Sequence, residues 1–193
     1  MKVSDFFLER HARLHGPMTD NELLGGMTDY EVRARPHGVN SIVWLLWHVA
    51  RCEDGALNFF VAGRPQVLEH EPWMERMNVP LRHKGTAMTS NEVDELSARV
   101  DVAALCAYWA AVGANTCSVV SALGAGQLDE IVTAEERRRV LVDEGFGGPH
   151  ENLDTLQAQP RGWFLAWPGL THSYGHFFEG FVTRGLVTRR RGS

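Results

Sequence analysis

The residues best suited to chemistry in this 193-residue chain are two histidines near its C-terminal end, His172 and His176. They are four positions apart, which on an α-helix places both side chains on one face, about 40° apart in projection. At this spacing one helix can supply two imidazoles to one metal ion. A pair of this kind also arises by chance in a chain with nine histidines, so a third ligand has to be found elsewhere.

His48 is the best candidate for that third ligand, because it lies within the apolar stretch 42–50. The alternative is a hydrogen-bonded core histidine, which is the commoner role on an apolar helix face. Three neutral imidazoles suit Zn, Ni or Fe(II), and affinity alone does not choose among these metals. Three protein ligands leave a coordination position open for water or substrate, which is typical of catalytic zinc. We therefore predict a divalent-metal site formed by His48, His172 and His176.

Helical periodicity places further side chains near this site. Glu179, one turn beyond His176, is a candidate fourth ligand, orienting residue or general base, or else a solvated carboxylate. Cys52, one turn beyond His48, either approaches the metal or is an inert buried thiol. The periodicity predicts that the pocket is lined by Trp44, Cys52, Phe59 and Thr183. The remaining histidines are expected in loops or on polar faces and receive no role: His11, His15, His37, His70, His83 and His150.

Four main helices are predicted to position these residues. Apolar periodicity indicates helices over about 3–15, 41–62, 90–123 and 163–186. The second is apolar on nearly every side, so we expect it to be buried over most of its circumference. The connections 63–88 and 125–162 are long, and no segment alternates like a strand. The pattern favours one all-α domain over residues 1–193, a four-helix bundle with long connections after its second and third helices.

Several residues are predicted to set the helix boundaries. Gly16–Pro17 should interrupt the first helix, because proline lacks the amide hydrogen that the helix needs. Asn40 is the expected N-cap of the second helix. A threonine followed three positions later by glutamate predicts a capping box, and this occurs at Thr19, Thr28, Thr89 and Thr133.

The last helix carries many aromatic residues on the side opposite its histidines. At 100° per residue this far side holds Trp163, Trp167, Leu170, Tyr174, Phe177, Phe178 and Phe181. Such a stripe is usually core, in which case the histidines would face water. If both faces are buried, the histidines face the bundle interior and the aromatic residues face a neighbouring helix or a second subunit. On this basis we predict a homodimer.

Composition and charge argue against several classes of protein. A net charge of −5 argues against a broad nucleic-acid surface, and the short basic cluster Arg189–Arg191 is expected to be a solvated tail. We expect no apolar run to approach the ~20 residues that span a bilayer, and Asp5 and Glu9 interrupt any signal-peptide core. Three cysteines without a C-x-x-C motif imply no disulfide framework. We predict a cytoplasmic protein without a membrane segment.

Two stretches of the sequence resemble the DinB-like superfamily of metal-binding bundle proteins. Residues 35–54, from Arg35–Pro36 through the apolar run around His48, are similar to the family's second helix. Residues 170–180 resemble its last helix, which carries an H-x3-H pair. The resemblance extends over about 5–187 and implies a four-helix bundle, commonly dimeric. By motif position it also implies a divalent metal on His48, His172 and His176.

The resemblance implies a chemistry as well. Relatives include transferases and isomerases that use low-molecular-weight thiols such as bacillithiol or mycothiol, with a metal that activates the thiol. Seventeen arginines against two lysines suggest a high-GC bacterial genome, which favours mycothiol. We expect a metal-dependent enzyme acting on a small-molecule electrophile. The alternatives are a metal-dependent hydrolase, a non-catalytic metal-binding stress protein, and a bundle whose three histidines are core residues.

Overall fold

The structure, a computed structural model, describes residues 3–189. Its longest α-helices are α1 (Val3–Arg13), α3 (Ile42–Gly55), α6 (Val102–Ser121) and α9 (His172–Thr188). Shorter ones are α2 (Asp29–Arg33), α4 (Trp73–Arg76), α5 (Ser90–Arg99), α7 (Ala134–Val142) and α8 (Arg161–Ala166). Segments of π-helix extend three of the rods: η1 (Leu14–Leu23), η3 (Ala56–Ala62) and η6 (Trp167–Thr171). Single 3-10 turns are η2 (Pro36–Gly38), η4 (Val67–Glu69) and η5 (Gln127–Asp129).

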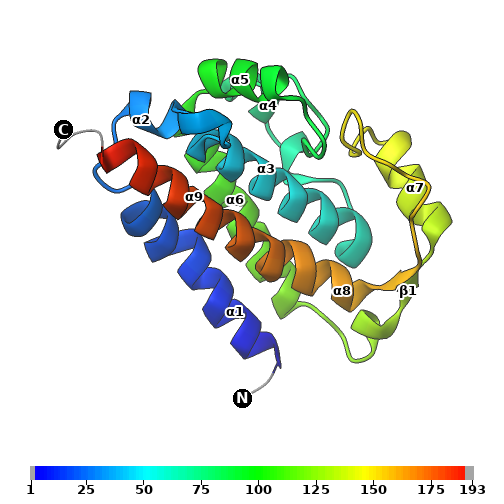
Figure 1. The fold of residues 1–193 in the computed structure, drawn as a ribbon. Helices are drawn as coiled ribbons and strands as arrows, with labels where there is room; N and C mark the ends of the chain where they lie inside the picture. Colours follow the sequence, from blue (N-terminus) through cyan, green and yellow to red (C-terminus); the bar gives the residue numbers. More distant parts are fainter. Residues whose placement is uncertain (1–2, 190–193) are drawn as a thin grey trace.

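Four long rods form the bundle shown in Figure 1: α1 with η1, α3 with η3, α6, and the continuous run α8–η6–α9. The central rod α3 contacts both α6 and α9, while α1 contacts α6 and η1 contacts α9. The predicted all-α four-helix bundle is therefore confirmed. Its long connections follow the second rod, at 63–89, and the third rod, at 122–160.

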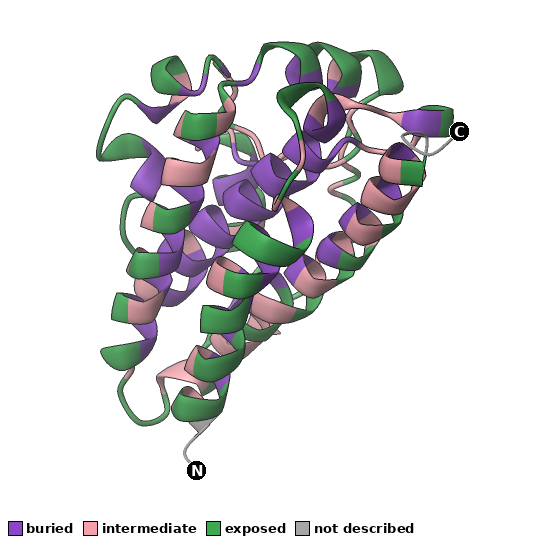
Figure 2. Cartoon of the chain, turned by 90° about the vertical axis from the view of Figure 1, so that its left-hand side faces the viewer, coloured by how far each residue is buried: buried purple, intermediate pink, exposed green. Residues whose placement is uncertain are grey.

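The helix α3 runs through the centre of the bundle, and every one of its residues is buried, as predicted. Figure 2 shows the buried residues gathered along the middle of the molecule. Two charged residues of α3, Arg51 and Asp54, pair with each other inside the core. Arg51 donates to Asp54 at 3.2 Å, and Asp54 also accepts a 2.6 Å hydrogen bond from the Tyr108 hydroxyl. A helix held on all sides in this way gives His48 a fixed position.

The start of α3 differs from the prediction. Ser41, not Asn40, is the N-cap, and its hydroxyl accepts a 3.1 Å hydrogen bond from the Trp44 amide. The capping boxes predicted at Thr28, Thr89 and Thr133 are all present. The fourth is absent, because the Thr19 hydroxyl donates instead to the Leu14 carbonyl at 2.6 Å.

The predicted interruption at Gly16–Pro17 is wrong. The helix continues as η1, in which hydrogen bonds reach back five residues instead of four. Pro17 lies inside this wider turn. The hydrogen bond from the Thr19 hydroxyl to the Leu14 carbonyl spans the turn. The same arrangement recurs in η6, where the Ser173 hydroxyl donates to the Pro168 carbonyl at 2.8 Å.

The predicted helix over 90–123 is two helices. Val100 has an extended ψ of 134°, which ends α5. The Asp101 carboxylate then accepts from the Ala104 amide at 2.8 Å and caps α6. An aspartate in an apolar repeat can end one helix and start the next, because its side chain hydrogen-bonds the backbone.

The connection between α6 and α8 contains a two-stranded antiparallel sheet that the sequence did not indicate. Strand β1 (Ile131–Val132) pairs with β2 (Gln159–Pro160), so that Ile131 lies opposite Pro160. Two residues per strand are too few to show alternation. The pairing closes the loop that carries α7 and holds it against the side of the bundle seen at the right of Figure 1.

The helix α6 corrects the expectation that no apolar run approaches 20 residues. It has 20 residues, none of them charged, and by length and composition alone it could cross a membrane. Leu105, Tyr108, Trp109 and Val112 are buried against the rest of the bundle. These residues are part of the main hydrophobic core, so this side of α6 packs inside the bundle. The cytoplasmic location stays a prediction.

The homodimer also stays a prediction. On α9, Phe178 and Val182 are separated by one turn and are 61% and 62% exposed, so they form an apolar pair on the outer surface. Phe177 is buried in the core. A mass in solution of twice 21.6 kDa would establish the dimer. Of the basic tail, Arg190 and Arg191 lie outside the described residues.

Candidate metal centre

Three histidines from two helices converge where α3 passes the start of α9. His48 comes from the middle of α3, and His172 and His176 come from the first two turns of α9. The ring centroids of His48 lie 5.0 Å from those of His172 and 4.9 Å from those of His176, and the last two are 4.5 Å apart. The structure therefore brings the three rings together, whereas the ligand atoms that lie within 4.8 Å of one another belong to His48, Cys52 and His172.

Two of the rings are oriented through their Nδ1 atoms. His48 donates from Nδ1 to the carbonyl of Lys84 at 2.5 Å, and His176 donates from Nδ1 to the Glu179 carboxylate at 2.8 Å. The other oxygen of Glu179 accepts from the Asn40 side chain at 2.8 Å. Because each Nδ1 carries the proton, the Nε2 atoms of His48 and His176 are left with lone pairs. Histidine ligands in metal sites are usually held in this way.

The donor set fits a divalent metal. The Nε2 atoms of His48 and His172 are 3.3 Å apart. Two nitrogens bound to one tetrahedral zinc at about 2.0–2.1 Å would be separated by about 3.3–3.4 Å. The remaining nitrogen of His172, Nδ1, is buried without a hydrogen-bond partner among the described residues. The orientation of the His172 ring is therefore not fixed through Nδ1. It places the other nitrogen, Nε2, next to His48 Nε2.

Burial keeps two of these imidazoles neutral. Together with the weaker effect of the neighbouring histidines, it lowers the pKa of His48 to about 3 and that of His172 to about 4. A neutral imidazole is the form that binds a metal. Protons therefore do not compete with a cation for these two nitrogens at neutral pH.

We expect the metal-free protein to lose stability in mild acid. Below about pH 6.5 the unfolded chain protonates His48, whereas the folded chain does not until about pH 3. The unfolded state then binds more protons, so the free energy of unfolding falls as pH falls through this window. His48 alone should contribute a loss on the order of 2 kcal/mol between pH 7 and pH 5. Urea unfolding at both pH values measures it, and His48→Gln should flatten the dependence; a dependence unchanged in that variant would contradict the assignment.

The other predicted site residues lie at different distances from the three rings. Trp44 stacks on His48 with ring centroids 4.9 Å apart and planes 8° from parallel. The Cys52 sulfur is 3.8 Å from both ring nitrogens of His48, and it forms a group of close potential ligands with His48 and His172. Burial raises the pKa of this thiol to about 12, so it is protonated at neutral pH when no metal is bound. Cys52 is therefore a potential fourth ligand and not a free nucleophile.

Phe59 and Thr183 do not line the cavity beside the histidines. From Ala56 onward the helix is π-helical, and the wider turn rotates later residues away from the positions that 100° per residue predicts. Phe60 therefore lines the cavity, while the Phe59 ring packs against Phe146 at 5.8 Å. Thr183 is fully buried and donates to the Asn40 carbonyl at 3.1 Å, so it supports the residue that holds Glu179.

The π-helical η6 also resolves the conflict between the two faces of the last rod. Trp163, Trp167, His172 and His176 are separated by four, five and four residues. Because one π turn reaches back five residues, all four can lie along one side. The prediction that Trp163 and Trp167 lie opposite the histidines is therefore wrong, since both tryptophans line the same cavity as His172.

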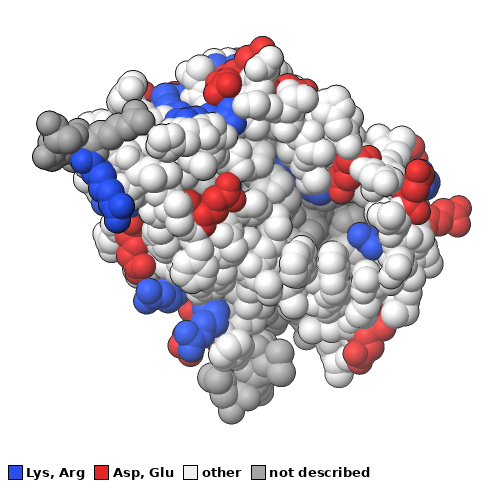
Figure 3. All heavy atoms as spheres, viewed as in Figure 1, with Lys and Arg blue, Asp and Glu red and all other residues white. Residues whose placement is uncertain are grey.

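This cavity has a volume of about 270 Å³ and opens beside His172. Figure 3 shows the hollow on the face viewed in Figure 1, surrounded mostly by uncharged atoms. The remaining walls come from the two long connections, and they include Lys84, Thr86, Arg137, Phe146 and Glu151. Sequence analysis assigned no function to these five residues. The only signal was the unusual length of the connections, since long loops in small domains are often functional.

A second histidine cluster lies on the other side of α3, where the sequence had suggested polar faces. His11 is buried and His15 is partly buried, and their Nε2 atoms lie 2.7 Å and 3.1 Å from the two oxygens of Glu53. The Thr116 hydroxyl donates to the same carboxylate at 2.7 Å. Burial alone would raise the pKa of Glu53, but the two histidines outweigh it and lower that pKa well below its usual value. The three side chains are close enough to hold a metal, yet they already satisfy one another as a hydrogen-bonded cluster.

Comparison with known proteins supports the fold and the family. The sequence matches the DinB superfamily over residues 18–165, a range that includes His48 and ends before His172 and His176. A crystal structure of a conserved protein from Enterococcus faecalis is similar over 97% of this chain and 98% of its own, with a TM-score of 0.71 and 22% sequence identity. No curated protein matches the sequence. The match over most of its length shows that the chain belongs to the DinB superfamily.

Proposed function

We propose that this protein is a divalent-metal-dependent enzyme that activates a low-molecular-weight thiol toward a small electrophile. The observation that carries the proposal is the convergence of His48, His172 and His176 beside the open cavity. Three protein ligands leave room for an exogenous ligand, as catalytic sites require and structural sites do not. Zn, Ni and Fe(II) all suit such a donor set.

The chain's own residues hold the site ready. The Lys84 carbonyl and the Glu179 carboxylate hold the rings of His48 and His176 through their Nδ1 atoms, which leaves the Nε2 atoms available to a ligand. The hydrogen bond from His176 lowers the pKa of Glu179, so this carboxylate stays ionised. It acts as an orienting residue and is a poor general base. A bound divalent cation would lower the pKa of a coordinated thiol or water so that it is a nucleophile at neutral pH.

The proposal also specifies the nucleophile, which is a low-molecular-weight thiol. Its support is the resemblance of the two motif stretches to thiol-dependent transferases and isomerases, together with a cavity wall rich in aromatic residues that would exclude water. We propose a mycothiol-like S-transferase or isomerase. The alternative is a hydrolase in which water takes the place of the thiol, and the same histidines would serve it.

The test is a thiol titration of the Co²⁺-loaded protein. We expect about one metal per chain by elemental analysis and a sulfur-to-cobalt absorption band that grows as mycothiol is added. Cys52→Ser should keep the band, which would show that the sulfur comes from the added thiol. Spectra that change with pH but ignore thiols would favour the hydrolase. Metal that responds to neither would indicate a structural site and overturn the enzyme proposal.

A further inference from the structure

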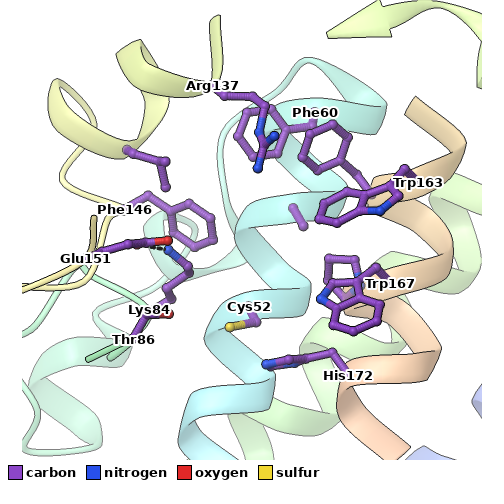
Figure 4. A pocket seen from close by; sticks show the side chains of 14 residues that line it. Cys52, Phe60, Lys84, Thr86, Arg137, Phe146, Glu151, Trp163, Trp167 and His172 are labelled. Carbon is purple, nitrogen blue, oxygen red and sulfur yellow. Dashed lines mark hydrogen bonds and ion pairs between the residues drawn. The ribbon is translucent and has the colours of Figure 1, made fainter. Parts of the chain in front are cut away.

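The cavity beside the histidines has two chemically different ends. Figure 4 shows His172 and Cys52 at one end and the guanidinium of Arg137, from α7, entering at the other. Trp163 and Trp167 form the wall between them. A molecule lying along this wall would have one end near the three imidazoles and the other against a cation.

Basic side chains outnumber acidic ones in the lining of the cavity. Lys84 is paired with Glu151, whose carboxylate also accepts from the Gly148 amide at 2.9 Å. Arg137 has no carboxylate partner among the described residues: it donates to the Gln157 carbonyl, and its Nε is buried without a partner. Of the two basic side chains of the cavity, Arg137 is therefore the one without an ion-pair partner among the described residues. Burying an unpaired charge is costly unless an anion joins it.

The wall between the two ends is aromatic. The central guanidinium carbon of Arg137 lies 5.5 Å from the Trp163 ring, and the Trp163 and Trp167 rings are 6.1 Å apart and 11° from parallel. Trp167 then lies 6.5 Å from His172. A cavity of about 150 Å³ holds a benzene ring, so a volume of about 270 Å³ accommodates one ring with a short substituent.

We propose that the cavity binds an aromatic carboxylate, with the ring along Trp163 and Trp167 and the carboxylate on Arg137. Arg137 is then the residue that determines specificity. This inference rests on the proposed function only where it identifies the ligand as the electrophilic substrate. The reactive end of that substrate would lie near His172. Binding of the carboxylate itself does not depend on a metal. A charge-assisted, two-pronged contact of this kind would give a clear preference for the acid over a neutral analogue.

Tryptophan fluorescence can test this with two probes of the same shape, 3-phenylpropionate and 3-phenylpropionamide. Wild-type protein should bind the acid at least about tenfold more tightly than the amide, both metal-free and zinc-loaded. Arg137→Gln should abolish that preference, and Arg137→Lys should keep part of it, because lysine keeps the charge and loses the fork. Circular dichroism confirms that each variant is folded.

Arg138→Gln is the matched control. Arg138 is the next residue of α7, is half-exposed, and contacts Asp154 and the Leu153 carbonyl outside the cavity. This variant should retain the full preference for the acid. Equal binding of acid and amide by the wild type, binding of neither, or a preference that survives in Arg137→Gln would each overturn the proposal. If the wild-type protein prefers the acid but binds no metal, this inference stands and the proposed function is overturned.

Discussion

Replacing His172 by alanine should reduce bound metal from about one per chain to a small fraction. His172 Nε2 lies 3.3 Å from its counterpart on His48, so its removal takes one of the three neighbouring imidazoles out of the site. Loss of a supporting residue around a metal ligand typically costs ten- to a hundredfold in affinity, and loss of a ligand should cost at least about a hundredfold. Equilibrium dialysis with Zn²⁺ measures the change, and any thiol-dependent activity should be lost with the metal.

His150→Ala is the control for this experiment. His150 is a histidine with 57% of its side chain exposed, and it lies in the connection before α8. Its replacement should leave metal content unchanged, which excludes adventitious binding to surface histidines. Full metal retention in His172→Ala would remove the three-histidine assignment and leave these residues as core histidines.

Replacing Glu53 by alanine should be the most destabilising single change outside the metal centre. It removes the acceptor of hydrogen bonds from His11, His15 and Thr116 and leaves three buried polar groups without a partner. Each buried polar group left without its partner costs about 1–3 kcal/mol, so a loss of about 3–5 kcal/mol is expected for the cluster. In a chain of this length that corresponds to a fall in Tm of roughly 6–20 °C. Thermal and urea unfolding should agree on the loss.

Two comparisons make this result specific. Glu9→Ala, on the exposed face of α1, should change the free energy of unfolding by no more than about 0.5 kcal/mol. Glu53→Ala should also keep its single equivalent of metal, because the cluster is separate from the three converging rings. Loss of one of two metal equivalents would show instead that His11, His15 and Glu53 form a second metal site.

The helical architecture and the three histidines could be predicted because both depend on local periodicity. Apolar residues on every side of 42–55 indicate a buried helix whatever surrounds it. The four-residue spacing of His172 and His176 indicates a shared face. His11 and His15 have the same spacing, and their burial was missed because the residues that cover them, Glu53 and Thr116, come from distant helices.

What could not be predicted depends on changes of helical period and on contacts between distant segments. The π turns of η3 and η6 alter which residues share a face, so Phe60 replaces Phe59 and the two tryptophans move to the histidine side. Lys84 and Arg137 reach the cavity through long connections whose paths have no periodic signal. A helical wheel drawn at a constant 100° per residue shows neither the change of helical period nor the contacts with distant segments.

The single wide turn of η6 gives the number of residues between the tryptophans and the histidines a structural role. That number, and not the identity of the side chains, determines how the cavity wall meets the metal centre. The π turn is equivalent to one residue inserted into an ordinary helix. Without that insertion, the tryptophans of α8 and the histidines of α9 would be rotated by roughly 100° relative to each other. A lineage that lost or gained one residue here would keep every functional side chain and separate the binding wall from the ligands. Single-residue insertions and deletions in 167–171 are thus the changes through which relatives with this fold can acquire or lose the combined site.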